Sequence, residues 1–292
     1  MLYFCLISIK SYYAYNHNPC KKSGVTRIHS IFYIFTHENG INFKYRTFPN
    51  TNLCLSVYNQ NQVEYIRNNI QNSCFIDKSE HGYVSRLFGF HTRPFEVEIK
   101  SALEQFCILS HPSGLRAFTR VPYKMLMNKQ DVFEMIFQDS TLLTLVFDTP
   151  DSNEKAQILE SFLLNHIIGS DVDIKLNMAL NAITDKKGSI SVNELAGMLR
   201  LNASTIFRYF NTYVGQSPKE YIQTVRFRYT LNNLLTHKYQ NLTELTYIAD
   251  FYDQSHLIKN FKKNTGNIPS NLPDQIKVEQ EKLAWITNIP LA

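Results

Sequence analysis

Residues 191–210 decide the fold, and they read SVNELAGMLRLNASTIFRYF. Residues 241–261 repeat them in altered form as NLTELTYIADFYDQSHLIKNF. In the first part of the repeat the offset is fifty positions, from Ser191 to Asn241, and beyond the turn it is fifty-one, from Asn202 to Asp253. Each copy reads as a short helix, a tight connection, an Asn or Asp that caps a helix, and a second helix. The repeat predicts two helix-turn-helix units.

Three helix starts carry the same capping chemistry. They are Ser191-x-x-Glu194, Ser217-x-x-Glu220 and Asn241-x-x-Glu244. In such a motif the first side chain accepts a hydrogen bond from a backbone N–H that the helix leaves unpaired. The glutamate side chain can in turn accept one from the backbone N–H of the first residue. Pro218 occupies the first helical position, where a missing N–H costs nothing. We therefore expect helices to begin at these three places.

The second helix of the first copy has one apolar and one polar face. Ile206 and Phe210 lie four residues apart and are expected to face the core. At about 100° per residue, the opposite face carries Ser204, Arg208 and Asn211, with Thr205 and Phe207 at its flanks.

The second copy repeats this arrangement. Leu257 and Phe261 are expected to face inward. The exposed positions are then Ser255, Lys259 and Lys262, with His256 at the flank. Such a face suits base edges and phosphates in a major groove of DNA. The alternative for either helix alone is an ordinary solvated face, and the repetition favours the first reading.

A long helix is expected between the two copies, from Pro218 to about Thr236. Nineteen residues span roughly 28 Å as a helix, and one turn of DNA is about 34 Å. A rigid linker of that length could place both second helices in successive major grooves on one face of a duplex.

Taken together, these motifs resemble the AraC/XylS family of transcription regulators over residues 175–272, about a third of the chain. The resemblance is carried by Leu195-Ala196, Ile206-Phe207-Arg208-Tyr209-Phe210, Gly215-Gln216-Ser217-Pro218-Lys219-Glu220-Tyr221, Arg226, Asp253-Gln254-Ser255-His256-Leu257, Phe261, Gly266 and Pro269. It implies a DNA-binding domain with two recognition helices. On the family pattern the contacts fall on Ser204, Thr205, Phe207 and Arg208 in the first unit, and on Gln254, Ser255, His256 and Lys259 in the second.

The sequence departs from the family at several positions. Where the family usually has glycine in the turn, this chain has Arg200 and Asp250, and Thr246 replaces a small alanine. Residues other than glycine can adopt the required backbone at some cost. Asp250 places a negative charge near the expected DNA side. Phe207 is unusual at a base-facing position, and it could contact a thymine methyl group or turn into the core.

The N-terminal part predicts strands with interspersed helices. Asn39-Gly40, between apolar runs at 31–35 and 41–45, predicts a hairpin. Further strands are expected at Leu53–Tyr58 and Val84–Phe90, and Phe95–Phe106 has the spacing of an amphipathic helix. Glu154–Ile168 is expected to be helical, and no strand is expected from Asp171 onward.

The expected fold class is α+β, with a strand-rich mixed N-terminal domain followed by an all-α domain of two helix-turn-helix subdomains joined by a long linker helix. We expect an N-terminal regulatory or dimerisation domain at 1–150, a helical connector at 151–170, the DNA-binding domain at 171–272 and a C-terminal extension at 273–292. Stretches at 87–94 and 111–118 are weakly similar to a poorly characterised N-terminal domain found ahead of such units.

Charge and cysteine content agree with a cytoplasmic protein of this kind. Residues 171–272 hold 12 Lys and Arg against 8 Asp and Glu, a net charge of +4, as a phosphate-binding surface needs. The five cysteines contain no CxxC pair, which speaks against a disulfide framework and a zinc site. The N-terminus lacks the features of a signal peptide, and no apolar run is long enough to span a membrane. No metal or cofactor is expected.

The predicted function is sequence-specific binding of promoter DNA by a bacterial, nucleoid-associated regulator, more in keeping with an activator than a repressor. RNA polymerase is an expected partner; a small-molecule effector and a homodimer are open. One alternative is an interaction module with a degenerate helix-turn-helix fold. Another is a DNA-repair alkyltransferase, for which Pro19-Cys20-Lys21-Lys22 is a faint echo that lacks an activating histidine. Motifs of other enzyme classes are absent from the sequence.

Overall fold

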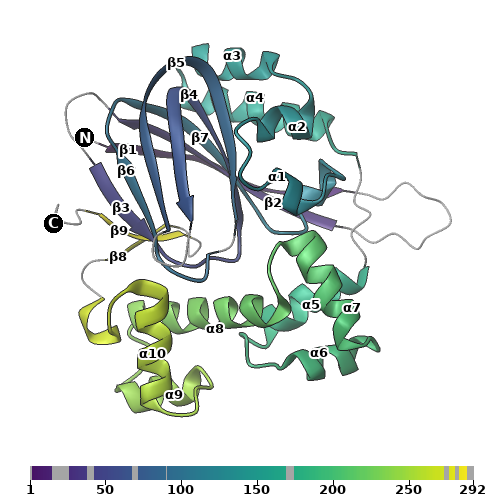
Figure 1. Cartoon of the computed structure of the whole chain (residues 1–292), viewed down its shortest axis with the longest axis vertical. Helices are drawn as coiled ribbons and strands as arrows, with labels where there is room; N and C mark the ends of the chain where they lie inside the picture. Colours follow the sequence, from purple (N-terminus) through teal and green to yellow (C-terminus); the bar gives the residue numbers. More distant parts are fainter. Residues whose placement is uncertain are drawn as a thin grey trace.

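The computed structural model describes residues 2–14, 26–37, 43–67, 72–89, 91–168, 174–272, 276–279 and 283–287. Figure 1 shows a strand-rich N-terminal part above a layer of helices from the C-terminal part. Within the described residues, no helix is long and apolar enough to cross a membrane.

The described strands form one sheet with the order β1-β2-β7-β4-β5-β6-β3-β9-β8. All neighbouring strands in it are antiparallel except β5 and β6, which are parallel. Their bounds are β1 Leu2–Ala14, β2 Thr26–His37, β3 Phe43–Thr47, β4 Leu53–Arg67, β5 Asn72–Phe88, β6 Phe95–Ile99, β7 Leu103–Ser110, β8 Ile276–Glu279 and β9 Leu283–Thr287. The expected strands at 53–58 and from 84 are thus confirmed, as parts of the long pair β4 and β5.

Neighbouring residues of β4 face two different cores, because successive side chains of a strand point to opposite sides. Val57 belongs to a core shared with the helices that follow the sheet, whereas Tyr58 belongs to a cluster made by strand residues. These helices are η1 Leu115–Ala117, α1 Tyr123–Leu126, α2 Val132–Phe137, α3 Thr141–Asp148 and α4 Ser152–Asn165. The helix expected at 154–168 is confirmed as α4, which begins and ends slightly earlier.

The hairpin expected at Asn39-Gly40 is wrong. The turn itself lies outside the described residues, but the runs on either side of it do not pair with each other. β2 lies between β1 and β7, and β3 lies between β6 and β9, so both edges of each strand are taken. Asn-Gly reports only a local preference for positive φ, and partners far along the chain decide the pairing.

The helix expected at 95–106 is also wrong. Phe95, Val97 and Ile99 alternate as the buried side of β6, and the chain turns before β7 begins at Leu103. The spacing of apolar residues across this turn imitates a helical repeat by coincidence.

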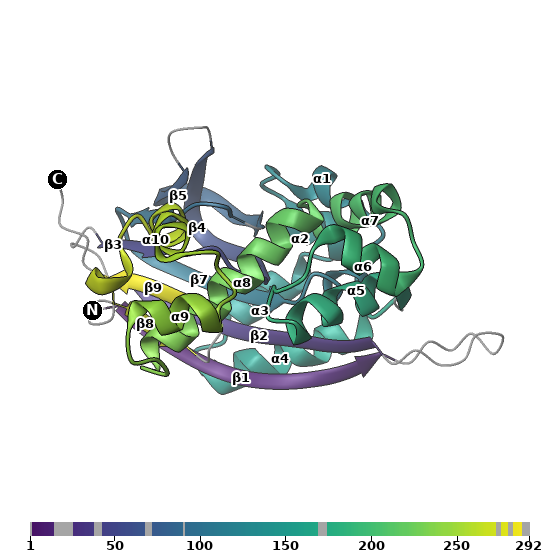
Figure 2. The same ribbon diagram turned by 90° about the horizontal axis from the view of Figure 1, so that it is seen from below.

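All secondary-structure elements described between residues 174 and 272 are helices. They are α5 Ile174–Asp185, α6 Val192–Leu199, α7 Ala203–Tyr209, a π-helical turn η2 Phe210–Val214, α8 Pro218–Leu235, α9 Leu242–Ile248, α10 Gln254–Thr265 and η3 Pro269–Asn271. Figures 1 and 2 show α6 and α7 near one end of α8, and α9 and α10 near the other. The long linker helix is confirmed, with eighteen residues.

The expectation of no strand after Asp171 fails in the C-terminal extension. β9 pairs with β3, Thr47 opposite Trp285, and β8 pairs with β9. The extension thereby adds two strands to the N-terminal sheet. These strands are too short to show alternation in the sequence, and a free sheet edge supplies the hydrogen bonds that define them.

Candidate nucleic-acid interface

The two helix-turn-helix units begin with the expected caps. Ser191 accepts a hydrogen bond from the Glu194 backbone N–H, and the Glu194 carboxylate accepts one from the backbone of Ser191. Hydrogen bonds to the Glu194 carboxylate from the Ser191 side chain and from the Ser191 backbone stabilise its charged form and lower the pKa of Glu194. Asn241 caps α9 by accepting from the Glu244 N–H at 3.0 Å. The start of α8 has the same complete capping box, with Pro218 in its first turn.

Both turns have the same backbone geometry. Arg200 has φ 51° and Asp250 has φ 53°, in the left-handed region that favours glycine. The backbone N–H of Leu201 donates to the Ala196 carbonyl at 3.0 Å, and Phe251 donates to Thr246 in the same way at 3.0 Å. The two non-glycine residues therefore adopt the backbone that the motif requires.

The second turn is one residue longer than the first. In the first unit Asn202 follows Leu201 and caps α7, and in the second unit Tyr252 stands between Phe251 and the cap Asp253. Tyr252 is 92% exposed, so the added residue bulges into solvent. This explains why the sequence offset changes from fifty to fifty-one.

The second helices expose the polar faces that the sequence predicts. Ile206 and Phe210 are buried in the first unit, and Leu257 and Phe261 in the second. Phe207 is 54% exposed, so it does not turn into the core. Thr205 and Asn211 are half-buried, and the Asn211 side chain donates to the Phe207 carbonyl at 2.9 Å. The remaining predicted contact residues are exposed: Ser204, Arg208, Gln254, Ser255, His256, Lys259 and Lys262.

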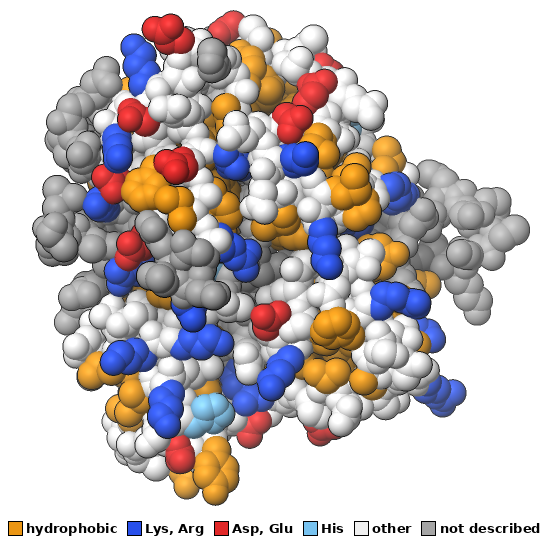
Figure 3. Space-filling model, viewed as in Figure 1, with side chains coloured by type: hydrophobic (Ala, Val, Ile, Leu, Met, Phe, Trp, Pro, Cys, Tyr) orange, Lys and Arg blue, Asp and Glu red, His pale blue; other side chains and the backbone are white. Residues whose placement is uncertain are grey.

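Positive charge lies on the same surfaces. Arg208 is the basic residue in the last turn of α7, and Lys262 and Lys263 lie in the last turn of α10. Figure 3 shows Lys and Arg side chains spread over the lower half of the molecule, where the C-terminal helices lie. The charge needed to approach a phosphate backbone is therefore present on this part of the protein.

The two units have separate cores. The first unit continues the core of the N-terminal domain, and Tyr123 of α1 lies against Gly215, just after η2. The second unit packs Leu257 and Phe261 on the C-terminal half of α8, with Phe48 from the N-terminal domain. Sequence periodicity predicted the inward residues of each unit but gave no signal for the contacts with Tyr123 and Phe48.

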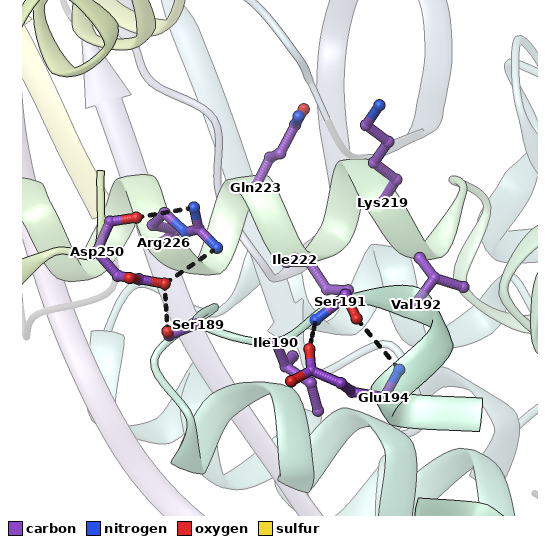
Figure 4. Close-up of a pocket in the computed structure, with 10 residues that line it drawn as sticks. All are labelled: Ser189, Ile190, Ser191, Val192, Glu194, Lys219, Ile222, Gln223, Arg226 and Asp250. Carbon is purple, nitrogen blue, oxygen red and sulfur yellow. Dashed lines mark hydrogen bonds and ion pairs between the residues drawn. The ribbon is translucent and has the colours of Figure 1, made fainter. Parts of the chain in front are cut away.

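A polar cluster connects the units across α8 (Figure 4). The Arg226 guanidinium donates to the Gly188 carbonyl from Nη2 at 2.7 Å and from Nε at 3.0 Å, and to the Asp250 carbonyl from Nη1 at 3.1 Å. The Asp250 carboxylate accepts from the Ser189 hydroxyl. The carboxylate is therefore engaged by the protein, a role that the sequence did not reveal. The cluster borders an open pocket of about 450 Å³ that also touches Lys219.

Comparison with known families identifies this part of the chain. Residues 195–275 match the family model described as a helix-turn-helix domain. The C-terminal domain is a helix-turn-helix domain of the AraC type. The match covers both turns and both second helices, α7 and α10.

One curated relative supports the same assignment. The chain is 30% identical over 125 residues to the Msm operon regulatory protein of Streptococcus mutans serotype c (strain ATCC 700610 / UA159). The alignment covers 42% of this chain and 45% of that protein, so the chain spans less than half of the relative's length.

Solved structures of ToxT from Vibrio cholerae resemble the chain weakly. ToxT from Vibrio cholerae in its P21 crystal form has a TM-score of 0.43 and 12% identity, covering 82% of this chain and 96% of that one. ToxT from Vibrio cholerae O395 has a TM-score of 0.39 and 13% identity, covering 82% and 95%.

Proposed function

We propose that the protein is a sequence-specific DNA-binding transcription regulator that inserts α7 and α10 into successive major grooves. One observation carries the proposal. Two units with the same turn geometry expose polar second helices and are joined by α8, whose eighteen residues span about 27 Å. This length is close to the roughly 34 Å of one DNA turn.

Within the proposal, the ten contact residues are those named from the sequence. Arg208 is assigned to base reading, because a guanidinium can pair with two acceptors of a guanine. The lysines of α10 are assigned to the phosphate backbone, and we place the main sequence readout in the first unit. The similarity to a protein named as an operon regulator supports regulation of transcription.

Selection from a random library of double-stranded DNA tests the proposal. The full-length chain is expected to enrich one site with two short motifs about one helical turn apart. Binding should weaken steeply with salt, because phosphate contacts release counterions. A protein that enriches no sequence, and whose affinity for DNA does not depend on salt, would instead support the interaction module.

The remaining parts of the proposal concern regulation. We assign residues 1–150 to regulation or dimerisation, 151–170 to a connector, 171–272 to DNA binding and 273–292 to an extension, and we propose activation through RNA polymerase. The proposal includes binding of a small-molecule effector by the N-terminal domain and formation of a homodimer. Transcript changes in a deletion strain, compared with mapped binding sites, should show genes that lose expression; a gain of expression would indicate a repressor.

An alkyltransferase activity is not part of the proposal. Its faint sequence echo at Cys20 lies outside the described residues. Incubation with alkylated DNA should leave every thiol free, and stoichiometric loss of one thiol would overturn the assignment.

A further inference from the structure

Arg226 of α8 holds together two segments that belong to different units. Its guanidinium donates two hydrogen bonds to the Gly188 carbonyl, in the loop before α6, and one to the Asp250 carbonyl, in the turn between α9 and α10. The planar guanidinium has donors fixed in a fork, so it restrains both acceptors at once. We call Gly188, Ser189, Arg226 and Asp250 the clasp.

The loop of the first unit lies directly on α8. A Cβ atom at Gly188 would come within 2.5 Å of the Arg226 backbone nitrogen and 2.6 Å of the Ile222 carbonyl oxygen. Gly188 has φ +75°, a conformation that other residues rarely adopt. The glycine thus lets the Gly188 carbonyl reach the guanidinium.

Asp250 adds a direct bond between the units. Its carboxylate accepts the Ser189 hydroxyl, and Oδ2 lies 3.8 Å from Nη2 of Arg226. In Figure 4 the Ser189 and Arg226 side chains both point toward this carboxylate, while Lys219 and Gln223 point elsewhere. Arg200, at the equivalent left-handed turn position of the first unit, is exposed. The clasp is therefore asymmetric, and its aspartate is supplied by the second unit.

The position of the clasp suits it to fix how the two units are arranged more than to raise the free energy of unfolding. The Asp250 side chain is 63% exposed and that of Arg226 is 23% exposed, and ion pairs with such exposure contribute little to folding. Each unit already packs its apolar core on its own half of α8. The two cores are separate clusters, and the clasp links the loop of the first unit to the turn of the second.

We propose that Asp250, acting through Ser189 and Arg226, is a positioning residue that fixes the distance between α7 and α10 and so the spacing between the two half-sites that the protein accepts. The inference rests on the proposed DNA binding.

The test is selection from a random double-stranded DNA library by full-length wild type, Asp250→Gly, Asp250→Asn and Ser189→Ala. Glycine suits the φ of 53° at this position, so the first variant keeps the turn while it loses the carboxylate. Arg200→Gly is the matched control, because it relaxes the same backbone conformation in the other unit without touching the clasp.

We expect wild type and Arg200→Gly to enrich a single spacing, and the Asp250 and Ser189 variants to enrich that spacing together with neighbours one base pair longer or shorter. In direct binding, the ratio of Kd between the site with one inserted base pair and the selected site should fall about threefold in Asp250→Gly.

The same single spacing for all proteins would overturn the clasp while leaving the DNA-binding proposal intact. An equal gain of affinity on every DNA in Asp250→Gly would likewise overturn it, since it would mean that the carboxylate only repels phosphates. A wild type that enriches no sequence would overturn both the proposed function and the inference.

Discussion

Arg208 and Lys262 both lie on the exposed sides of the second helices, yet they are expected to act differently. Replacing Arg208 by alanine should weaken binding to the selected site by about 1–3 kcal/mol, while binding to unrelated DNA changes much less. The reason is that a lost base contact matters only where the correct base is present. Titrations of the selected site and of a scrambled duplex measure the two affinities, and equal losses on both would contradict a base-reading role.

Lys262→Ala is the companion variant. If Lys262 touches a phosphate, its loss should weaken binding to all DNA and reduce the slope of log affinity against log salt by about one. If the slope of log affinity against log salt does not change, Lys262 does not contact a phosphate of the DNA.

For single residues, the sequence predicted well which side chains are exposed, and poorly which side chains contact each other. The four-residue spacing of Ile206 and Phe210 decided which side chains of α7 face outward, and the structure agrees for Ser204 and Arg208. The engagement of Asp250 could not be predicted, because its partners lie 24 and 61 positions away in the chain. Whether the exposed side chains contact DNA stays a prediction.

Among the elements, the end of η2, which follows α7, is tightly constrained. Gly215 has φ +87°, and a Cβ there would lie 2.3 Å from the ring of Tyr123. Gly215→Ala should therefore lower the free energy of unfolding by about 2 kcal/mol or more, from backbone strain and overpacking together.

Gly197 provides the control for this change. It lies inside α6, and a Cβ there would meet no atom within 4 Å. Gly197→Ala should stabilise the protein by about 0.5–1 kcal/mol, because alanine loses less backbone entropy in a helix. Chemical denaturation measures both variants, and a Gly215 variant as stable as wild type would show that α1 does not hold the first unit.

Elements set by local chemistry were predictable, and elements set by distant partners were not. The caps Ser191 and Ser217 fix helix starts within a few residues of themselves, so the sequence reveals them. The pairing of β3 with β6 and with β9 joins segments about 50 and 240 positions apart. No local pattern announces such partners, which is why the expected hairpin and the expected helix at 95–106 failed.

For the whole molecule, the two cores predict different behaviour of the two units. In an isolated fragment of residues 171–292 the first unit loses the cover of Tyr123, which is buried in the intact chain. Backbone amides of residues 210–215 should then exchange with solvent about tenfold faster or more, whereas the α9–α10 segment, which loses Phe48 from its core, should change less. Hydrogen exchange on the fragment and on the full chain measures this difference.

Tyr123→Ala in the full-length chain checks the cause. It should speed exchange at 210–215 in the same way, with β4 and β7 left protected. Equal protection of this segment in fragment, variant and wild type would show that the first unit is stable by itself.

The contact of Tyr123 with Gly215 also bears on protein engineering. A hybrid regulator joined at the connector, with the sensor of another protein in front of α5, would lack the aromatic ring that covers this glycine. A fusion that keeps α1 together with the C-terminal helices should therefore keep the first unit folded where a cut before α5 would not.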